Sequence, residues 1–156
     1  MTVTVKDHGA NQMLRRLRGT SVEVDVGIDS DQGHPATVDG LPSIDALALI
    51  HEFGAGRIPA RSFIRGWVDE RGEFIRWMLT AAGTQIIGGT RALVDVAKEL
   101  GAELTGDCLE RFDAGIAPPL AESTVARKGH DTILVETGTL RAALSYLATV
   151  KTRGAR

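Results

Sequence analysis

The stretch SVEVDVGI, residues 21–28, decides the fold class expected for this chain. Four β-branched residues alternate along it with small or acidic residues. The β-branched residues are Val22, Val24, Val26 and Ile28. Successive side chains of a strand point to opposite faces, so this alternation predicts a β-strand with one buried face.

A second alternating stretch near the C-terminus supplies the expected partner strand. Leu144, Tyr146, Ala148 and Val150 alternate with Ser145, Leu147, Thr149 and Lys151. This favours a terminal strand, although the preceding LRAAL is rich in alanine and leaves a long helix as the alternative. Residues 140–143 are expected to add one helical turn before that strand.

Between these strands the apolar residues recur every three to four positions, which predicts helices. Helices are expected over residues 44–53, from about Ser62 to residue 86, and over residues 93–112. Ser43 is a suitable N-cap for the first, and Gly54 can end it. Gly88 and Gly89 predict a bend or break. Shorter helices are expected over residues 9–18 and 120–128.

The combined pattern predicts an α+β fold, in which a small antiparallel sheet is packed by several helices. Its middle is one long helical region that is kinked or broken. The 156 residues, 43% of them hydrophobic, suffice for one domain over residues 1–156. A mobile loop is expected over residues 29–42, which are rich in Asp, Gly and Pro, and a frayed tail over residues 151–156.

Composition narrows the function classes. Eighteen basic and twenty acidic residues give a net charge of −2, which argues against coating nucleic acid through bulk charge. The single cysteine, Cys108, lies in an apolar row and is expected in the core. Neither a signal peptide nor a membrane-length apolar run is evident, so we expect a soluble protein made in the cytoplasm, with no membrane partner.

No residue pattern predicts catalysis, a cofactor or a metal site. His51 and Glu52 begin like the zinc motif HExxH, but Ala55 stands where the second histidine is required. GAGR at residues 54–57 is too short for a phosphate-binding loop. We therefore expect a protein that is not an enzyme. A cell-wall hydrolase that depends on Glu52 is the least favoured alternative.

Two longer passages resemble a known group of proteins. HEFGAGRIPARSFIR, residues 51–65, and GIAPPLAESTVARKGHDTILVETGTLRAALSY, residues 115–146, are similar in order and spacing to segments of phage head-tail joining and tail-completion proteins, including the virion morphogenesis families. Ser62 stands where proline is common in those proteins, and Ala143 where serine is common. The resemblance covers roughly 60% of the chain and involves no catalytic motif.

The resemblance implies a structural virion protein that forms a ring at the neck or at the head-proximal end of the tail. Its partners would be copies of itself, six being the usual number, together with head-tail connector and tail-tube or tail-terminator proteins. DNA would pass through the lumen of the ring. Tail completion and neck adaptor remain alternatives, as do contractile and flexible tails.

The first passage also supplies the expected partner interface. A turn stiffened by proline, with arginines and apolar residues around it, can dock with little loss of conformational entropy. The predicted interface residues are Glu52, Phe53, Arg57, Ile58, Pro59, Arg61 and Phe63. The alternative is a tight connector within one subunit, with arginines that face water.

A second class of function remains open from the N-terminal sequence. Arg15, Arg16 and Arg18 form a basic cluster, which a small nucleic-acid-binding or regulatory module could use. Such clusters are more commonly solvated surfaces. Replacing the three arginines would separate this alternative from the ring, for which Arg57 and Arg61 are expected to matter.

Overall fold

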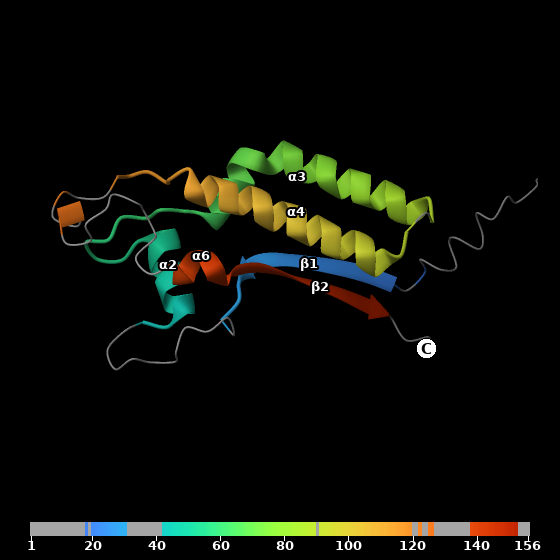
Figure 1. The fold of residues 1–156 in the computed structure, drawn as a ribbon, viewed down its shortest axis with the longest axis horizontal. Coiled ribbons are helices and arrows are strands. Elements are labelled where there is room, and N and C mark those ends of the chain that lie inside the picture. The colour runs from blue at the N-terminus through green and yellow to red at the C-terminus, as the bar shows by residue number, and fades with distance from the viewer. Residues whose placement is uncertain are drawn as a thin grey trace, which may run out of the picture.

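The chain folds around a two-stranded sheet that is made from sequence-distant segments (Figure 1). The computed structural model describes residues 18, 20–30, 42–89, 91–119, 122, 125–126 and 138–152. In chain order the elements are β1 (Thr20–Ile28), α2 (Ile44–Phe53), α3 (Ile64–Ile87), α4 (Leu93–Asp113), α6 (Thr139–Ala143) and β2 (Leu144–Thr152). The α+β prediction is confirmed.

Several sequence-based predictions concern segments outside the described residues. The expected helix at residues 9–18, the loop at residues 29–42, the helix at residues 120–128 and the last four residues of the expected tail at 151–156 belong there, apart from a few single positions. They stay predictions. The expected tail begins too early, because Lys151 and Thr152 pair with β1 as the end of β2.

β1 and β2 pair in antiparallel fashion over nine residues each. Val24 lies opposite Ala148, and Val26 lies opposite Tyr146. Val24 and Val26 pack against the core, as the alternating pattern predicted. The terminal strand is therefore confirmed over the helical alternative. On the other face of the sheet Lys151 forms an ion pair with Glu23.

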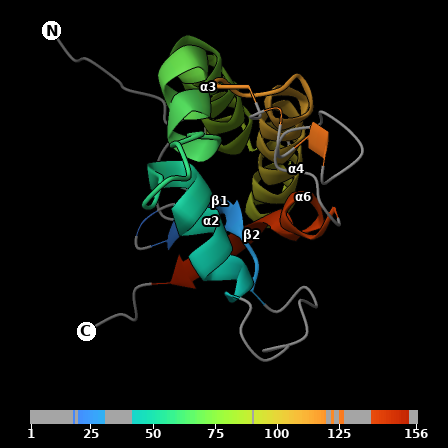
Figure 2. The ribbon, with the colours of Figure 1, turned by 90° about the vertical axis from the view of Figure 1, so that its left-hand side faces the viewer.

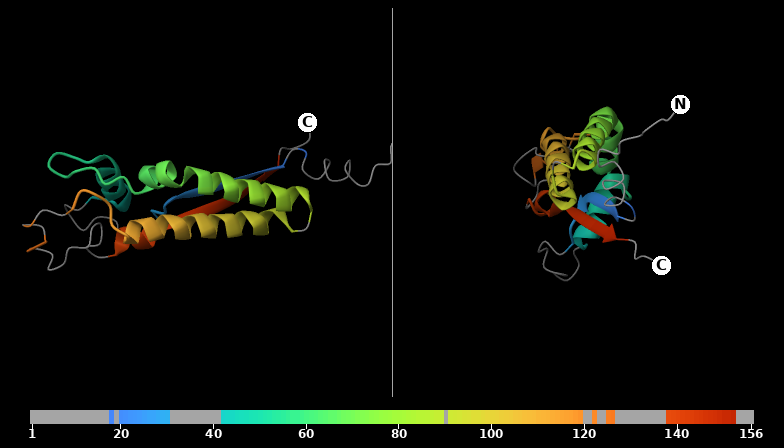
Figure 3. Two further views of the ribbon diagram at one scale, coloured as in Figure 1. Left: turned by 90° about the horizontal axis from the view of Figure 1, so that it is seen from above. Right: turned by 90° about the vertical axis from the view of Figure 1, so that its right-hand side faces the viewer.

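α3 and α4 form an antiparallel helical hairpin that lies over the sheet (Figure 3). Gly88 and Gly89 end α3, and Gly89 has a positive φ of 65°, so the predicted break is confirmed. α4 contacts both strands. A Cβ at Gly101 would collide with the ring of Tyr146, so glycine is what lets α4 approach β2 this closely.

α2 and α6 lie close together at one end of the molecule (Figure 2). Buried side chains of both helices belong to the core cluster, together with Phe63 and Phe112. Phe63 and Phe112 meet edge to face there, with ring centroids 5.7 Å apart. Cys108 is fully buried, which confirms the core prediction. Along the rest of α3 the apolar stripe is only partly covered. Trp77, for example, remains 63% exposed.

Local chemistry fixes both ends of α2 as predicted. The Ser43 hydroxyl accepts a hydrogen bond from the Ala46 amide at 3.2 Å, which is an N-cap interaction. Gly54 ends the helix with a φ of 78°. A Cβ at Gly54 would stand 2.9 Å from the Ala60 nitrogen, so the backbone conformation and the available space both require glycine.

Candidate functional site

The segment between α2 and α3 forms a short, stiff hairpin. The Ala55 amide donates to the Ile58 carbonyl at 3.0 Å, and the Ile58 amide donates to the Ala55 carbonyl at 2.8 Å. Gly56 between them has a φ of 55°. We call residues 53–59 the hairpin tip. In Figure 1 this part of the molecule reaches beyond α2 at one end.

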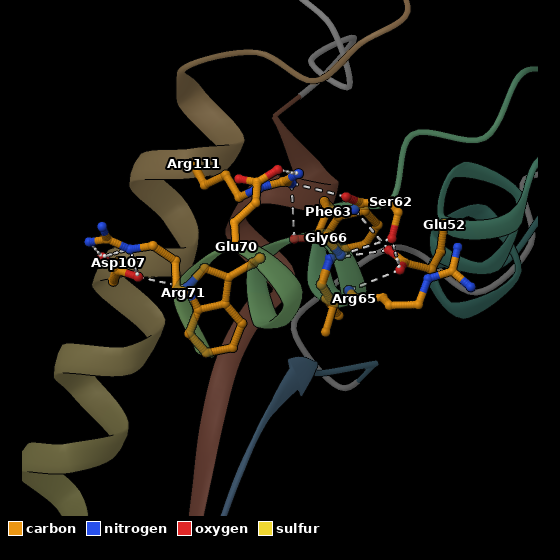
Figure 4. A network of polar contacts seen from close by, with 11 residues as sticks. Glu52, Ser62, Phe63, Arg65, Gly66, Glu70, Arg71, Asp107 and Arg111 are labelled. Atoms are coloured by element: carbon orange, nitrogen blue, oxygen red, sulfur yellow. Dashed lines mark hydrogen bonds and ion pairs between the residues drawn. The ribbon is translucent and has the colours of Figure 1, made fainter. Parts of the chain in front are cut away.

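Glu52 fixes the base of the tip to the start of α3. One carboxylate oxygen accepts from the Phe63 and Ile64 amides at 2.9 and 3.1 Å. The other accepts from the Arg65 amide at 3.0 Å and from the Ser62 hydroxyl. The three backbone amides are donors that an α-helix leaves without partners in its first turn. Figure 4 shows Glu52 reaching them from α2, so the carboxylate caps a helix other than its own.

The protonation state of Glu52 follows from the same contacts. Burial disfavours the charged carboxylate and raises the pKa, but the hydrogen bonds from Ser62 and from the three amides together outweigh it, and the net pKa is lowered. Glu52 is therefore a fixed anion at neutral pH. With both oxygens occupied by donors, it is poorly suited to donate or accept a proton in a reaction.

Arg61 secures the other side of the hairpin base. Its Nε donates to the Pro118 carbonyl at 2.9 Å, and Nη2 donates to the Pro119 carbonyl at 3.2 Å. Its own amide donates to the His51 carbonyl at 2.6 Å. Arg61 is 5% exposed. Its guanidinium thus joins the two distant passages of sequence that contain residues 51–65 and 115–119.

Arg111 of α4 extends this network to α3 (Figure 4). It forms a two-pronged ion pair with Glu70, both contacts being 2.7 Å, and donates to the Ser62 carbonyl at 2.9 Å. The hydrogen bond from Arg111 lowers the pKa of Glu70. A Cβ at Gly66 would lie 2.6 Å from Arg111 Nη2, so the missing side chain leaves room for the guanidinium.

One helical turn earlier on α4, Asp107 makes a parallel connection. It accepts from Trp67 Nε1 at 2.7 Å and from the guanidinium of Arg71. The hydrogen bond from Arg71 is the largest of the influences that lower the pKa of Asp107. Because Asp107 and Arg111 are four residues apart, they project from the same face of α4 toward α3.

The structure divides the seven predicted interface residues into two groups. Glu52, Arg61 and Phe63 are buried at 8%, 5% and 1% exposure and make contacts within the subunit. These three residues therefore connect parts of one subunit, and they are not exposed for a partner in this structure. Arg61 does not face water as the connector alternative expected, because it binds the Pro118 and Pro119 carbonyls. The exposed residues are Phe53, Arg57, Ile58 and Pro59.

The exposed group lies on the hairpin tip. Phe53 is 60% exposed and Ile58 is 43% exposed. The Arg65 guanidinium lies 5.5 Å from the centre of the Phe53 ring, which holds that ring in an exposed position. The tip therefore presents apolar side chains beside the cationic Arg57 on a backbone that is fixed from below.

Sequence reasoning missed most partners of the network. Glu70 is exposed, and it binds Arg111 across the two helices. Asp107 and Arg111 are four residues apart on α4, and their partners Arg71 and Glu70 are adjacent on α3. The paired opposite charges on the two segments were an available signal for two helices joined by ion pairs. Ser62 was noted only as a departure from proline, and its hydroxyl in fact accepts from the Gly66 amide at 3.0 Å.

The site shows no signature of a bound metal or of a membrane segment. Within the described ranges no group of three His, Cys, Asp or Glu side chains is arranged to hold a metal ion. Of the helices described, none has the length and apolar character that crossing a membrane demands. Comparisons with protein-family models, with curated proteins and with solved structures give no match to this protein.

Proposed function

We propose that this protein is a non-enzymatic structural component of a tailed-phage virion, which assembles into a ring at the joint between head and tail. The resemblance of residues 51–65 and 115–146 to head-tail joining and tail-completion proteins supports this proposal. The contacts of Arg61 with Pro118 and Pro119 add support, since the two resembling passages meet in space as one unit.

The observation that carries the ring is the open sheet. Within the described residues the sheet has two strands, each with one long edge that no other described strand covers. The Asp29 amide donates to the Ala143 carbonyl at 2.8 Å. Hydrogen-bonded and non-hydrogen-bonded pairs alternate along an antiparallel ladder. Val24 and Ala148 lie five pairs away from Asp29 and Ala143 and form a pair without hydrogen bonds between its two members. Their backbone N–H and C=O groups therefore point away from the partner strand, toward the open edges of the sheet.

Such edges are templates for pairing with another polypeptide. One outer edge of the sheet belongs to β1 and the other to β2. The β1 edge of one copy can therefore pair with the β2 edge of the next copy. This contact is head-to-tail, and head-to-tail contacts close into a ring when the rotation between copies permits. The ring would leave a central channel for DNA. The hairpin tip then offers a contact for the neighbouring connector or tail protein.

Ala148→Pro tests the edge pairing. Proline removes the outward amide at this position without removing a hydrogen bond between β1 and β2. We expect the variant to keep its far-UV circular dichroism spectrum and to lose the oligomer in light scattering after size-exclusion chromatography. Ala148→Val is the matched control, because it keeps the amide and should keep the oligomer.

A folded Ala148→Pro variant that assembles like the parent protein would contradict edge pairing. Val150→Pro repeats the test two residues nearer the end of the strand, where a proline disturbs the fold less. Its amide also points outward, since Val150 pairs with Val22 in the same alternation. A parent protein that stays monomeric at all concentrations, by itself and with neck or tail components, would overturn the ring itself.

A further inference from the structure

An open groove runs between the second half of α3 and the first half of α4. Met78 and Ala82 of α3 and Val96 and Leu100 of α4 contribute its apolar lining, and its volume is about 240 Å³. Glu103 stands at its rim. With 100° per residue, Glu103 is on the side of α4 opposite to Gly101, which faces the sheet. The groove therefore opens away from the sheet.

The groove is acidic along its length. Glu99 and Glu103 line its first part, and Glu103, Asp107 and Glu110 line its continuation toward the C-terminal end of α4. Glu99 is paired with Arg91, and Asp107 with Arg71. Glu103 has no ion pair or hydrogen bond to another described side chain. An apolar floor with the Glu103 carboxylate, unpaired among the described side chains, at its rim fits a segment that is both apolar and basic.

The protein itself contains such a segment. GANQMLRRLR, residues 9–18, is predicted from its sequence to place Met13, Leu14 and Leu17 on one side of a short helix, together with three arginines. The structure describes only Arg18 of this stretch, and Arg18 is exposed. The segment joins β1 at Thr20, at the end of the molecule where α3 turns into α4 (Figures 1 and 3). The groove is near that same end.

The geometry favours the groove of another copy over that of the same copy. Only Gly19 separates the segment from β1, which lies on the sheet side of α4, whereas the groove is on the far side of a helix about 10 Å thick. A ten-residue helix is about 15 Å long, so most of its length would be used in passing the end of the hairpin.

We propose that residues 9–18 of one copy bind the α3–α4 groove of the adjacent copy, with Leu14 and Leu17 on the apolar floor and the arginines of the segment beside the acidic rim that includes Glu103. This inference rests on the proposed ring. It assigns the N-terminal arginines to assembly, in place of nucleic-acid binding.

A cysteine cross-link between two different subunits tests the contact. One subunit carries Leu14→Cys and the other Trp77→Cys, at the exposed edge of the groove. Native Cys108 does not compete, because it is fully buried. Mixing the two variants under mild oxidation should give a covalent dimer on a non-reducing gel. The matched control is Glu73→Cys, whose native side chain is 99% exposed on α3 and does not line the groove; it should give no dimer with Leu14→Cys.

Exchanged charges provide the second measurement. The arm variant carries Arg15→Glu and Arg16→Glu, and the groove variant carries Glu103→Arg and Glu110→Arg. Each variant by itself should assemble only at higher concentration than the parent protein, since like charges then face each other. Mixed together, the two variants should regain assembly near the parent concentration, because each arm then meets an oppositely charged groove in a neighbour. Contact within one copy predicts no recovery on mixing.

The results separate this inference from the ring. If the parent protein forms oligomers while the Leu14–Trp77 dimer and the recovery on mixing are both absent, the arm contact is wrong and the ring stands. If DNA binding is lost in the arm variant while assembly is unchanged, the arginines serve nucleic acid and the inference is overturned. If the parent protein forms no oligomer, the proposed ring fails and this inference fails with it.

Discussion

Replacing Glu52 by glutamine should destabilise the subunit through loss of the carboxylate cap on α3. The parent carboxylate accepts four hydrogen bonds, from the Ser62 hydroxyl and from the amides of Phe63, Ile64 and Arg65. An amide group can accept at only one of its two positions, and its NH₂ group faces donors at the other. One or two buried donors therefore lose their partner.

The expected size follows from those donors. Each buried donor left without a partner costs about 1–3 kcal/mol. Loss of the negative charge at the N-terminus of α3 adds about 0.3–1 kcal/mol. We therefore expect Glu52→Gln to lower the free energy of unfolding by about 3 kcal/mol at pH 7. Urea denaturation followed by circular dichroism measures it, at a protein concentration where the parent protein is monomeric.

The pH dependence gives an independent check. The folded-state pKa of Glu52 is lowered, so its ionisation stabilises the fold above the unfolded pKa, near 4.5, and this stabilisation is lost as the pH falls through the folded pKa. The difference in stability between parent and Glu52→Gln should therefore shrink below pH 4.5. Other carboxylates with lowered pKa values, such as Asp107, are present in both proteins and cancel in the difference.

Glu73→Gln is the matched control, since the Glu73 side chain is 99% exposed. It should change stability by no more than about 0.5 kcal/mol. The capping account would be refuted if Glu52→Gln were as stable as the parent at pH 7. It would also be refuted if the difference between the two proteins stayed constant from pH 7 to pH 3.

Three further predictions concern the core and the hairpin tip. Phe63→Ala should lower the free energy of unfolding by about 3–5 kcal/mol in urea titrations, as expected for a buried aromatic ring. Phe53→Ala should change the free energy of unfolding by less than about 0.5 kcal/mol. It should instead weaken the binding of neck or tail partners in a pull-down. Arg111→Lys should lower the free energy of unfolding by about 1–3 kcal/mol, because lysine cannot reproduce the paired contacts with Glu70 while reaching the Ser62 carbonyl. Thermal melts beside an Arg76→Lys control measure this loss. Cys108 should resist alkylation at pH 8 in the folded protein, since burial raises the pKa of its thiol to about 12, and should react fully in urea, as mass spectrometry would report.

The elements were predictable from sequence where periodicity and caps act locally. The alternation from Val22 to Ile28 identified β1, and Ser43 and Gly54 marked the ends of α2. The glycine pair located the break between α3 and α4. These features depend on residues within a few positions of one another, so a single sequence contains the whole cause.

The polar network was beyond local reasoning because its partners are far apart in sequence. Arg61 meets Pro118 some 57 residues away, and Arg111 meets Glu70 at a separation of 41. Both Glu52 and Arg61 carry charge within an exposed-looking segment, and charged residues are usually at the surface. Their burial depends on the tertiary fold, which turns two predicted interface residues into the base that holds the hairpin tip.

A reconstruction of the intact virus particle by electron microscopy would test the central claim most directly. The account predicts that subunits of this fold, identified by the paired long helices α3 and α4 over a sheet shared between neighbours, form a closed ring where the head meets the tail. Density for this protein elsewhere in the particle, or as isolated subunits whose strands do not pair with those of a neighbour, would contradict it.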